Sequence, residues 1–585
     1  MMSKMGRYGR RQPARNERGV FGLAGKLVEL LDRCAVSDRR ASLFLVAVCL
    51  VAFLPGFFSI PPLDRDEARF AQISRQMVET GNLTDVRLGA EARHTRPLGL
   101  YWLQAGVVGV VGAVGVPNAT QSIWLYRLPS LGAGIAAVLL TFWAALSFVG
   151  RRAAIFAATL LATCASLGVA SRLAVPDTIL LAAIAAMMGA LGRAYMGPSQ
   201  EADAPAPAVD GKLAAILWSA LALALLMKGA VAPLYVALPV VTLIVMDRSG
   251  RFMRPTAPII GLALCLLVVG VWVYLRHYVP ADGMSDADRG LIGRVAPAFP
   301  GFSSPPGAYL LMFWGLFWPA APLAALAVPI IWKARRLRAV RFLLAWVLPA
   351  WLLFEMLPTK LPAYVIPTFP AIAILVALAV ERGAMALANM RLVRLLWFWP
   401  LIGLVIAVTA LLGLAVFDHT TSLLAWPFLL AGFFALVAAA VSVREYGIEK
   451  ATLLGIAGRL ISGIGVMQLV LPQMDSIWIA PRLAEIVAQE RCVVSGQSLT
   501  VGAAGYNEPS FVFLAPGQAR YMDGSAAADF LSEGGCKAVF VERRQESRFV
   551  RRAEQLGLRI ERGADVRGFD YINGRRVRIS LYRKG

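Results

Sequence analysis

The stretch LDRDEARFAQISRQMVETG, Leu63 to Gly81, comes directly after the first long apolar run of this chain of 585 residues. Its first seven residues include five ionisable side chains. The apolar residues that follow have helical spacing up to Gly81, which predicts a helix that begins near Asp66. Carboxylates at a helix start commonly cap it and complement its dipole, so their role depends on what else shares their side of the membrane.

The composition is that of a membrane protein, with 58% hydrophobic and 16% charged residues and a mean hydropathy of +0.64. The apolar runs have the length that crosses a hydrocarbon core about 30 Å thick. We therefore expect a polytopic α-helical protein with about thirteen transmembrane helices. The expected spans lie near residues 43–60, 125–149, 153–170, 178–195, 213–227, 230–246, 256–275, 308–331, 342–357, 362–380, 395–416, 421–442 and 451–471.

Basic residues predict the orientation, because lysine and arginine concentrate in cytoplasmic loops. The first forty residues are strongly basic, which places the N-terminus in the cytoplasm. The loops that alternate to the same side are basic as well, at 151–152, 248–254, 333–341 and 382–394. A further apolar run, 98–116, would invert these loops if it spanned, so we expect it to lie in the outer interface.

The same rule explains most of the formal net charge of +22, together with attraction to anionic lipid. Nucleic acid is therefore not an expected partner. No cleavable signal peptide is expected, because residues 1–40 are polar and the first apolar run is long enough to remain as an anchor.

Three parts follow along the chain. We expect a cytoplasmic basic segment at 1–40, a transmembrane domain at 41–471 with its first outer loop at 61–124, and an α/β domain on the outer side at 472–585. In the last part, CVVS, FVFL, KAVFVE and RVRISLY read as strands, and PRLAEIVAQE and SRFVRRAEQLG read as helices. Cys492 and Cys536 fall there, and a disulfide between them suits an oxidising compartment.

Three further clusters of polar residues face the same side as Leu63 to Gly81. They are RHTRPLGLYW at 93–102, SRLAVPD at 171–177 with Lys228 nearby on that side, and LPTKLPAYVIP at 357–367. Each could serve only to break helices and anchor interfaces. Charges near hydrocarbon are costly unless they are paired or used, however, so carboxylates and cations that repeatedly share one face indicate an active site.

Six short motifs along the chain resemble those of a known family. They are DEARFAQISRQMVETGN, RPLGLYW, RLAVPD, MKGAVAPL, KLPAYVIP and GYNEPSFVFL, in this order between about residues 60 and 515. With these motifs in this order, the chain resembles polyprenyl-phosphate-sugar-dependent glycosyltransferases of GT-C architecture. The specific resemblance is to the ArnT-like group, which transfers aminoarabinose to lipid A. Protein O-mannosyltransferases resemble the chain more distantly.

This resemblance implies a donor of undecaprenyl phosphate carrying one sugar, bound at the periplasmic face of a bacterial inner membrane. It also implies inverting transfer to lipid A or to another envelope glycan or lipid. The chemistry agrees, because a departing lipid phosphate needs cations, and the attacking group needs a carboxylate to orient or deprotonate it.

The expected site residues follow from the matching motifs. Asp66, which matches the acidic position of the family, and Asp177 are the expected catalytic carboxylates. Glu67 and Asp64 are expected to support the site without touching the substrate. The groups expected to bind the donor phosphate are Arg96, Lys360, Tyr364, Arg172 and Lys228.

One departure concerns a metal ion. Relatives that modify lipid A commonly read Glu-Lys-Pro where this chain has Thr95, Arg96 and Pro97. Arginine still suits a phosphate, but the missing acid is one that helps to bind a metal in that group. His94 is the nearest substitute, and a lone interfacial histidine is more often a bystander, so we expect no obligatory metal or other cofactor.

Two alternatives stay open at this point. The first is transfer to protein hydroxyl groups, as in the O-mannosyltransferases. The second is a flippase or transporter of lipid-linked sugars, which would place ionisable residues near the middle of the bilayer and often show repeated halves. The sequence does not identify the sugar or the acceptor.

Overall fold

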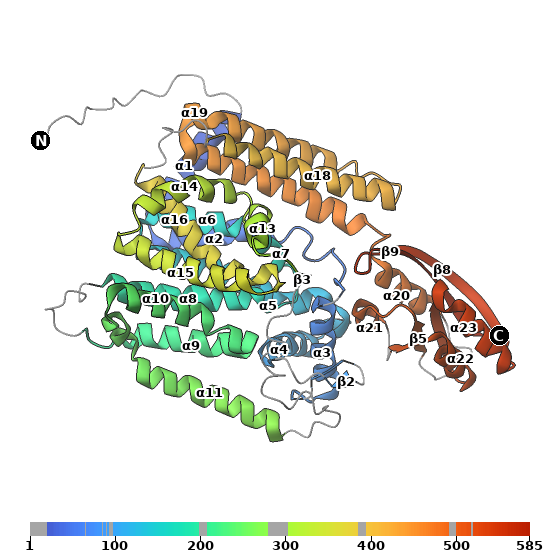
Figure 1. Ribbon diagram of the computed structural model, residues 1–585. Helices are drawn as coiled ribbons and strands as arrows, with labels where there is room; N and C mark the ends of the chain where they lie inside the picture. The colour runs from blue at the N-terminus through green and yellow to red at the C-terminus, as the bar shows by residue number, and fades with distance from the viewer. Residues whose placement is uncertain are drawn as a thin grey trace, which may run out of the picture.

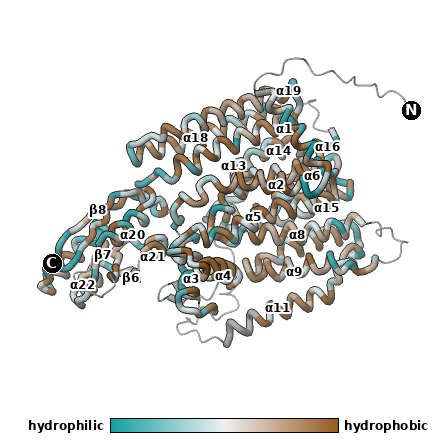
Figure 2. Tube along the Cα trace, turned by 180° about the vertical axis from the view of Figure 1, so that it is seen from behind, coloured by the Kyte–Doolittle hydropathy of each residue, from teal (hydrophilic) through white to brown (hydrophobic). Residues whose placement is uncertain are grey.

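The computed structural model describes residues 20–64, 66–84, 86–88, 91–92, 97–197, 207–278, 302–383, 393–490, 499–515 and 519–585. The chain forms a large bundle of helices with a smaller domain of helices and strands at one end (Figure 1). Apolar residues run along the bundle helices, and hydrophilic residues are more frequent in the smaller domain (Figure 2).

Most of the bundle helices coincide with predicted apolar runs. They are α1 (Val20–Cys34), α2 (Asp38–Phe53), α5 (Ile123–Ala145), α6 (Arg151–Ala162), α7 (Ala165–Ala170), α8 (Asp177–Met196), α9 (Gly211–Lys228), α10 (Leu234–Asp247), α11 (Pro258–Tyr278), α13 (Ala308–Leu316), α14 (Ala321–Lys333), α15 (Arg338–Met356), α16 (Phe369–Glu381), α18 (Phe398–Phe417) and α19 (Ala425–Ile464). Among the described residues, seven helical segments are long and apolar enough to cross a membrane. The chain is therefore a multi-pass membrane protein, while the expected number of thirteen spans is not confirmed.

Some expected spans are interrupted. The run 153–170 breaks between α6 and α7, and the run 308–331 breaks at Pro319, which cannot continue a helix without losing a hydrogen bond. The two breaks meet, because Ala165 N donates to Trp318 O at 3.0 Å. This bond satisfies irregular backbone inside the bundle, as a membrane interior requires. Further along, α19 joins two expected spans through a kink at Gly447, whose φ is +82°.

Charged residues tie the helices together at the end of the bundle predicted to be cytoplasmic. Arg151 pairs with Asp38 at 2.6 Å, and Arg152 pairs with Asp32 at 2.5 Å and Glu449 at 2.9 Å. All five residues are assigned to one membrane side by the alternation of loops. The smaller domain lies at the opposite end of the bundle (Figure 1).

The segment between α2 and α5, which is predicted to lie outside, forms α3 (Asp66–Thr80) and α4 (Gly99–Ala113), followed by a short turn before α5. The helix predicted from Leu63 to Gly81 is thus confirmed, and Gly81 ends it with φ +71°. α4 lies beside α3, near the ends of α5 and α9 that face the smaller domain (Figure 1). This position is compatible with the prediction that the apolar run 98–116 lies in the membrane interface. Short strand pairs join β1 (Arg87–Leu88) to β2 (Glu91–Ala92) and β3 (Phe302–Ser303) to β4 (Thr359–Lys360).

The smaller domain has a five-stranded mixed sheet in the order β6-β5-β7-β9-β8. β5 pairs in parallel with β6 and β7, whereas β9 pairs antiparallel with β7 and β8. Its elements are α20 (Ile479–Gln489), β5 (Thr500–Ala504), α21 (Pro509–Leu514), β6 (Ala519–Met522), α22 (Gly524–Ser532), β7 (Lys537–Glu542), α23 (Arg543–Gln555), β8 (Ile560–Asp570) and β9 (Arg575–Lys584). The expected α/β character of this domain is therefore confirmed.

The individual predictions for this domain had mixed outcomes. KAVFVE and RVRISLY lie in β7 and β9, and both predicted helices form as α20 and α23. FVFL was wrong as a strand, since it lies in α21. A short apolar run does not distinguish strand from helix, and Pro509 at the start of α21 favours the helix. CVVS and Cys492 lie outside the described residues, and Cys536 takes part in a disulfide.

Candidate active site

A buried ion pair supports the start of α3. Arg127 on α5 donates from Nε to Glu67 Oε1 at 2.7 Å and from Nη2 to Oε2 at 3.0 Å. The Glu67 carboxylate also accepts from Leu63 N at 2.8 Å and from Ala174 N at 3.0 Å. At most 1% of either side chain is exposed, so the pair is shielded from water and its geometry is held on several sides.

The remaining donors of Arg127 hold the segment that leads from α2 to α3. Arg127 Nη1 donates to Phe57 O at 3.0 Å and to Ile60 O at 2.8 Å, and Nη2 donates to Pro61 O at 3.0 Å. One guanidinium therefore joins α5, the end of the first span and the first turn of α3. This arrangement places Asp66, the neighbour of Glu67, at a fixed point of the outer end.

Hydrogen bonds from α3, α4 and α5 also hold the loop 171–177. Besides the bond from Ala174 N to Glu67, Gln104 Nε2 donates to Ala174 O at 3.2 Å, and Ser130 Oγ donates to Val175 O at 2.9 Å. These contacts come from α3, α4 and α5. They fix the backbone directly before Asp177, which is the first residue of α8.

Asp177 forms an ion pair with Lys228 at the end of α9. Asp177 Oδ1 and Lys228 Nζ are 2.8 Å apart, and about a quarter of each side chain is exposed, at 23% and 25%. A carboxylate in the first turn of α8 also suits the helix dipole. Unlike the Glu67–Arg127 pair, this pair has a surface that a ligand can reach.

Two of the sequence motifs, RPLGLYW and MKGAVAPL, lie next to each other beside this pair. α9 ends at Lys228 because Gly229 follows with φ +61°, a conformation that favours glycine. A Cβ added to Gly229 would lie 3.7 Å from Pro97 Cγ. RPLGLYW and MKGAVAPL are therefore neighbours in space. Arg96 precedes Pro97 in the chain, but it lies outside the described residues.

Two tyrosines lie near the Asp177 carboxylate, and one of them, Tyr364, belongs to the cluster at 357–367. Asp177 is close enough to interact electrostatically with Tyr235 and Tyr364. Tyr235 Oη donates to Tyr364 O at 2.8 Å, and Tyr309 Oη donates to Leu361 O at 2.9 Å. The turn that contains Tyr364 is thus held by two buried phenols, Tyr235 and Tyr309, and the first of them lies near Asp177.

Lys360 is turned inward. Lys360 Nζ donates to Leu357 O at 2.9 Å and to Ser304 O at 3.1 Å, and it lies 4.0 Å from Glu355. None of its side chain is exposed. In this geometry Lys360 joins the segment after β3 to the segment before β4, and a donor phosphate would reach its ammonium group only after these two segments rearrange.

Arg172 is occupied in a similar way. Its Nε donates to Pro55 O at 2.7 Å, and its two terminal nitrogens donate to Gly168 O and Ala52 O. The guanidinium therefore ties the loop 171–177 to the end of α2. This use of its donors argues against the expected direct contact with phosphate and for a structural role.

The two acidic residues at the start of α3 differ in their surroundings. Asp66 is exposed, whereas Asp64 lies against the smaller domain. Asp64 N donates to Tyr571 Oη at 2.9 Å, and Asp64 Oδ1 accepts from Ser510 N at 3.3 Å. Asp64 thus supports the docking of GYNEPSFVFL, while Asp66 is the carboxylate that a substrate can approach.

Burial raises the pKa of Asp64 to about 6, although the hydrogen bonds from Ser510 and Tyr571 lower it and Asp570 adds a smaller upward effect. Folding raises the pKa of this carboxyl, so the folded state holds the proton more tightly than the unfolded state does. The resulting stabilisation is fully present below the unfolded pKa and is lost as pH rises through the folded pKa. We expect the Tm of the wild type to fall between about pH 4 and pH 6, by an amount that corresponds to roughly 2 kcal/mol.

Asp64→Asn should flatten this part of the curve of Tm against pH. Thermal unfolding of both proteins in the same detergent measures the difference. Identical slopes in the two proteins would show that Asp64 does not link docking of the smaller domain to pH.

The structure does not test the prediction that no metal ion is obligatory. Within the described parts of the chain, no group of three or more histidine, cysteine, aspartate or glutamate side chains is placed to hold a metal ion. His94 and Thr95 lie outside these parts. These parts of the chain therefore contain no recognisable metal site.

Sequence reasoning missed Arg127, Tyr235 and Tyr309. A signal for Arg127 was present, because it is a charged residue inside the predicted span 125–149, and such residues are rare unless they are paired or functional. No comparable signal marked the tyrosines. Aromatic residues are common at membrane interfaces, so their grouping becomes visible only in three dimensions.

Comparisons with known proteins agree with this architecture. Residues 64–281 match the family model described as dolichyl-phosphate-mannose-protein mannosyltransferase. No curated protein matches the chain. ArnT from Cupriavidus metallidurans in the apo state has a similar structure, with a TM-score of 0.68 and 17% sequence identity over 92% of this chain and 97% of that chain.

The structure of the same ArnT bound to undecaprenyl phosphate is also similar, with a TM-score of 0.68 and 18% identity over the same shares of both chains. At this identity the likeness concerns the fold. The predicted fold, a GT-C bundle followed by a small α/β domain, is therefore confirmed.

Proposed function

We propose that this chain is a membrane glycosyltransferase that moves a sugar from a polyprenyl phosphate donor to an acceptor at the periplasmic face of a bacterial inner membrane. The partly exposed Asp177–Lys228 pair is the observation that carries this proposal. It lies at the end of the bundle that faces the smaller domain, in a fold shared with an ArnT whose structure holds undecaprenyl phosphate. Residues 64–281, which match the mannosyltransferase model, contain the pair.

The residues suit a single displacement at the anomeric carbon. The acceptor oxygen attacks this carbon, its proton passes to Asp66, and the bond to the lipid phosphate breaks with inversion. Lys228 balances the charge on the departing phosphate, and Asp177 holds Lys228 in place until the donor binds. Arg96 is assigned to the same phosphate because its neighbour Pro97 lies beside Gly229.

Tyr364 and Lys360 have different roles in this proposal. Tyr364 lies near Asp177 and donates to the sugar or phosphate, whereas Lys360 fastens the β3–β4 strand pair. Glu67 and Asp64 act through the positions of α3 and the smaller domain. Arg172 fastens the loop before Asp177 to α2.

The acceptor is assigned to lipid A or another envelope glycan or lipid. The support for a lipid-modifying enzyme is the similarity to ArnT along nearly the whole chain. The match of 64–281 to a protein mannosyltransferase model favours a second candidate, transfer to protein hydroxyl groups. A flippase has no comparable support, since neither comparison points to transport.

A deletion strain tests the function directly. Mass spectrometry of its lipids should show a polyprenyl phosphate sugar that accumulates, together with lipid A or another envelope component that lacks the mass of this sugar. Loss of the sugar from envelope proteins alone would favour the second candidate. A strain in which neither donor nor acceptor changes would contradict the proposed function.

Lys228 gives a further prediction. Lys228→Gln should weaken use of the donor by about 10- to 100-fold, the scale of a charge-assisted hydrogen bond, because the cation beside the leaving phosphate is lost. Transfer is measured per mole of purified protein with the donor concentration varied. Lys212 is exposed in the first turn of the same helix, so Lys212→Gln is the matched control and should retain normal transfer. Equal activity in both variants would remove Lys228 from the site.

A further inference from the structure

Arg459 is a second arginine inside the bundle, within the second half of α19, and it is separate from the candidate active site. Its Nε is buried and has no hydrogen-bond partner. Its guanidinium carbon lies 5.2 Å from the centre of the Trp318 ring. Apart from this ring contact, no hydrogen bond or ion pair joins Arg459 to any residue in the described parts of the chain. An arginine at membrane depth without a partner is costly, so it indicates a bound group.

A second uncompensated cation lies close by. Arg172 directs all its hydrogen bonds to backbone carbonyls, which leaves its charge without a carboxylate. A Cβ added to Gly168 would lie 3.3 Å from Arg172 Nη1 and 3.8 Å from Arg459 Nη2, so the two guanidinium groups flank the same point of α7. They repel each other at this separation. An anion between or beside them would relieve both charges.

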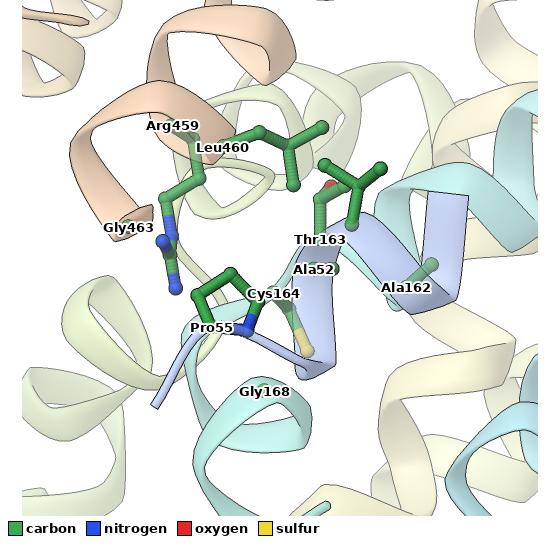
Figure 3. A pocket seen from close by; sticks show the side chains of 10 residues that line it. Ala52, Pro55, Ala162, Thr163, Cys164, Gly168, Arg459, Leu460 and Gly463 are labelled. Carbon is green, nitrogen blue, oxygen red and sulfur yellow. The ribbon is translucent and has the colours of Figure 1, made fainter. Parts of the chain in front are cut away.

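Arg459 faces a small cavity. Figure 3 shows its side chain extending from α19 past Gly463 towards Pro55 and Cys164. The cavity measures about 10 Å³, which is room for about one oxygen atom. Thr163 contributes a hydroxyl to the wall, but this group donates to Thr159 O at 2.8 Å. Arg459 therefore brings to this space a buried donor, Nε, that has no acceptor.

The cavity reaches an exposed part of α2. Val51 of α2 is one of its lining residues, and 48% of Val51 is exposed. The lining comes from α2, the α6–α7 break and α19, and none of it belongs to the candidate active site. A molecule that enters here approaches from the bilayer, where phosphate is the abundant anionic group.

We propose that Arg459, with Arg172 behind it, binds the phosphate of an anionic phospholipid at the opening between α2 and α19. One phosphate oxygen fills the cavity and accepts from the guanidinium of Arg459. The other oxygens lie at the mouth, and an acyl chain covers Val51. The planar fork of arginine suits such an oxygen pair better than an ammonium group does. This site holds a lipid of the surrounding membrane, and its role is independent of sugar transfer.

Thermal unfolding in nanodiscs tests this proposal. Nanodiscs of phosphatidylcholine are compared with nanodiscs that also contain phosphatidylglycerol. The anionic lipid should raise the Tm of the wild type by about 2–4 °C. Arg459→Gln should lose this gain, and native mass spectrometry should detect about tenfold weaker retention of phosphatidylglycerol.

Arg193 provides the matched control. It also stacks on a tryptophan, with its guanidinium carbon 3.7 Å from the centre of the Trp143 ring, but it does not line the cavity. Arg193→Gln should keep the gain in Tm. An undiminished gain in Arg459→Gln would overturn the proposal.

Two further measurements test the proposal. Inorganic phosphate added to phosphatidylcholine nanodiscs should not reproduce the gain, and a gain of equal size would overturn the assignment to a lipid. If Arg459→Gln does not fold, Arg459→Lys decides. This variant keeps the charge but loses the fork, so a reduced gain supports the proposal and an unreduced gain overturns it.

Discussion

Asp66→Asn is expected to reduce sugar transfer by about 10²–10⁴-fold, the usual contribution of a positioned general base. Asparagine keeps the size of the side chain and much of its ability to cap a helix. Asp66 is exposed, while the neighbouring Glu67 carries the buried contacts of α3. The variant should therefore fold and insert normally and lose only the group that receives the proton.

The measurement is transfer per mole of purified protein, with donor at a saturating concentration. Glu79 lies at the other end of α3, where it pairs with Arg75 at 2.7 Å and is 45% exposed. Glu79→Gln removes a carboxylate from the same helix and should retain normal transfer. Wild-type activity in Asp66→Asn would return Asp66 to the role of a helix cap.

Arg127→Met is expected to lower the free energy of unfolding by about 3–5 kcal/mol, the cost of breaking a buried ion pair on one side. The substitution leaves the Glu67 carboxylate buried without its cation and leaves the carbonyls of Phe57, Ile60 and Pro61 without their donor. Removing both charges should be less harmful than removing one. We therefore expect Arg127→Met combined with Glu67→Met to recover part of the loss.

Thermal unfolding of the two single variants and the double variant in detergent completes this double-mutant cycle. Arg127→Lys adds a separate comparison, because it keeps the charge but cannot reproduce the fork that reaches both Glu67 and the three carbonyls. If Arg127→Met unfolds at the wild-type temperature, the buried pair does not hold the outer end together. A double variant as unstable as the sum of the single variants would show that the two charges are not coupled.

The fold class could be predicted from the sequence because the length of an apolar run reports directly on membrane crossing. Helices such as α8 and α15 lie where their runs predict them, since all backbone groups of a helix are satisfied within the segment. Breaks inside runs were harder to foresee. The break at Cys164 is permitted by a bond from Ala165 to Trp318, a residue far away in the chain.

The order of motifs expected from the resemblance also predicted that the polar residues of the candidate site gather at one end of the bundle. Asp177, Lys228, Tyr364 and the segment after Arg96 come from four separate motifs, and their described members meet there. The sequence thus determined a helical membrane protein with polar clusters that share one face, because hydropathy and charge are properties of each segment by itself.

Only the tertiary structure decided what each charged side chain does. Lys228 meets a carboxylate at a surface, whereas Arg172 and Lys360 turn to buried carbonyls. Arg127 and Arg459 lie in similar apolar spans, yet one is fully paired and the other has no carboxylate partner among the described residues and meets only the Trp318 ring. The reason is physical: the acceptor that a guanidinium or ammonium group finds belongs to another helix, and its position depends on how the helices pack.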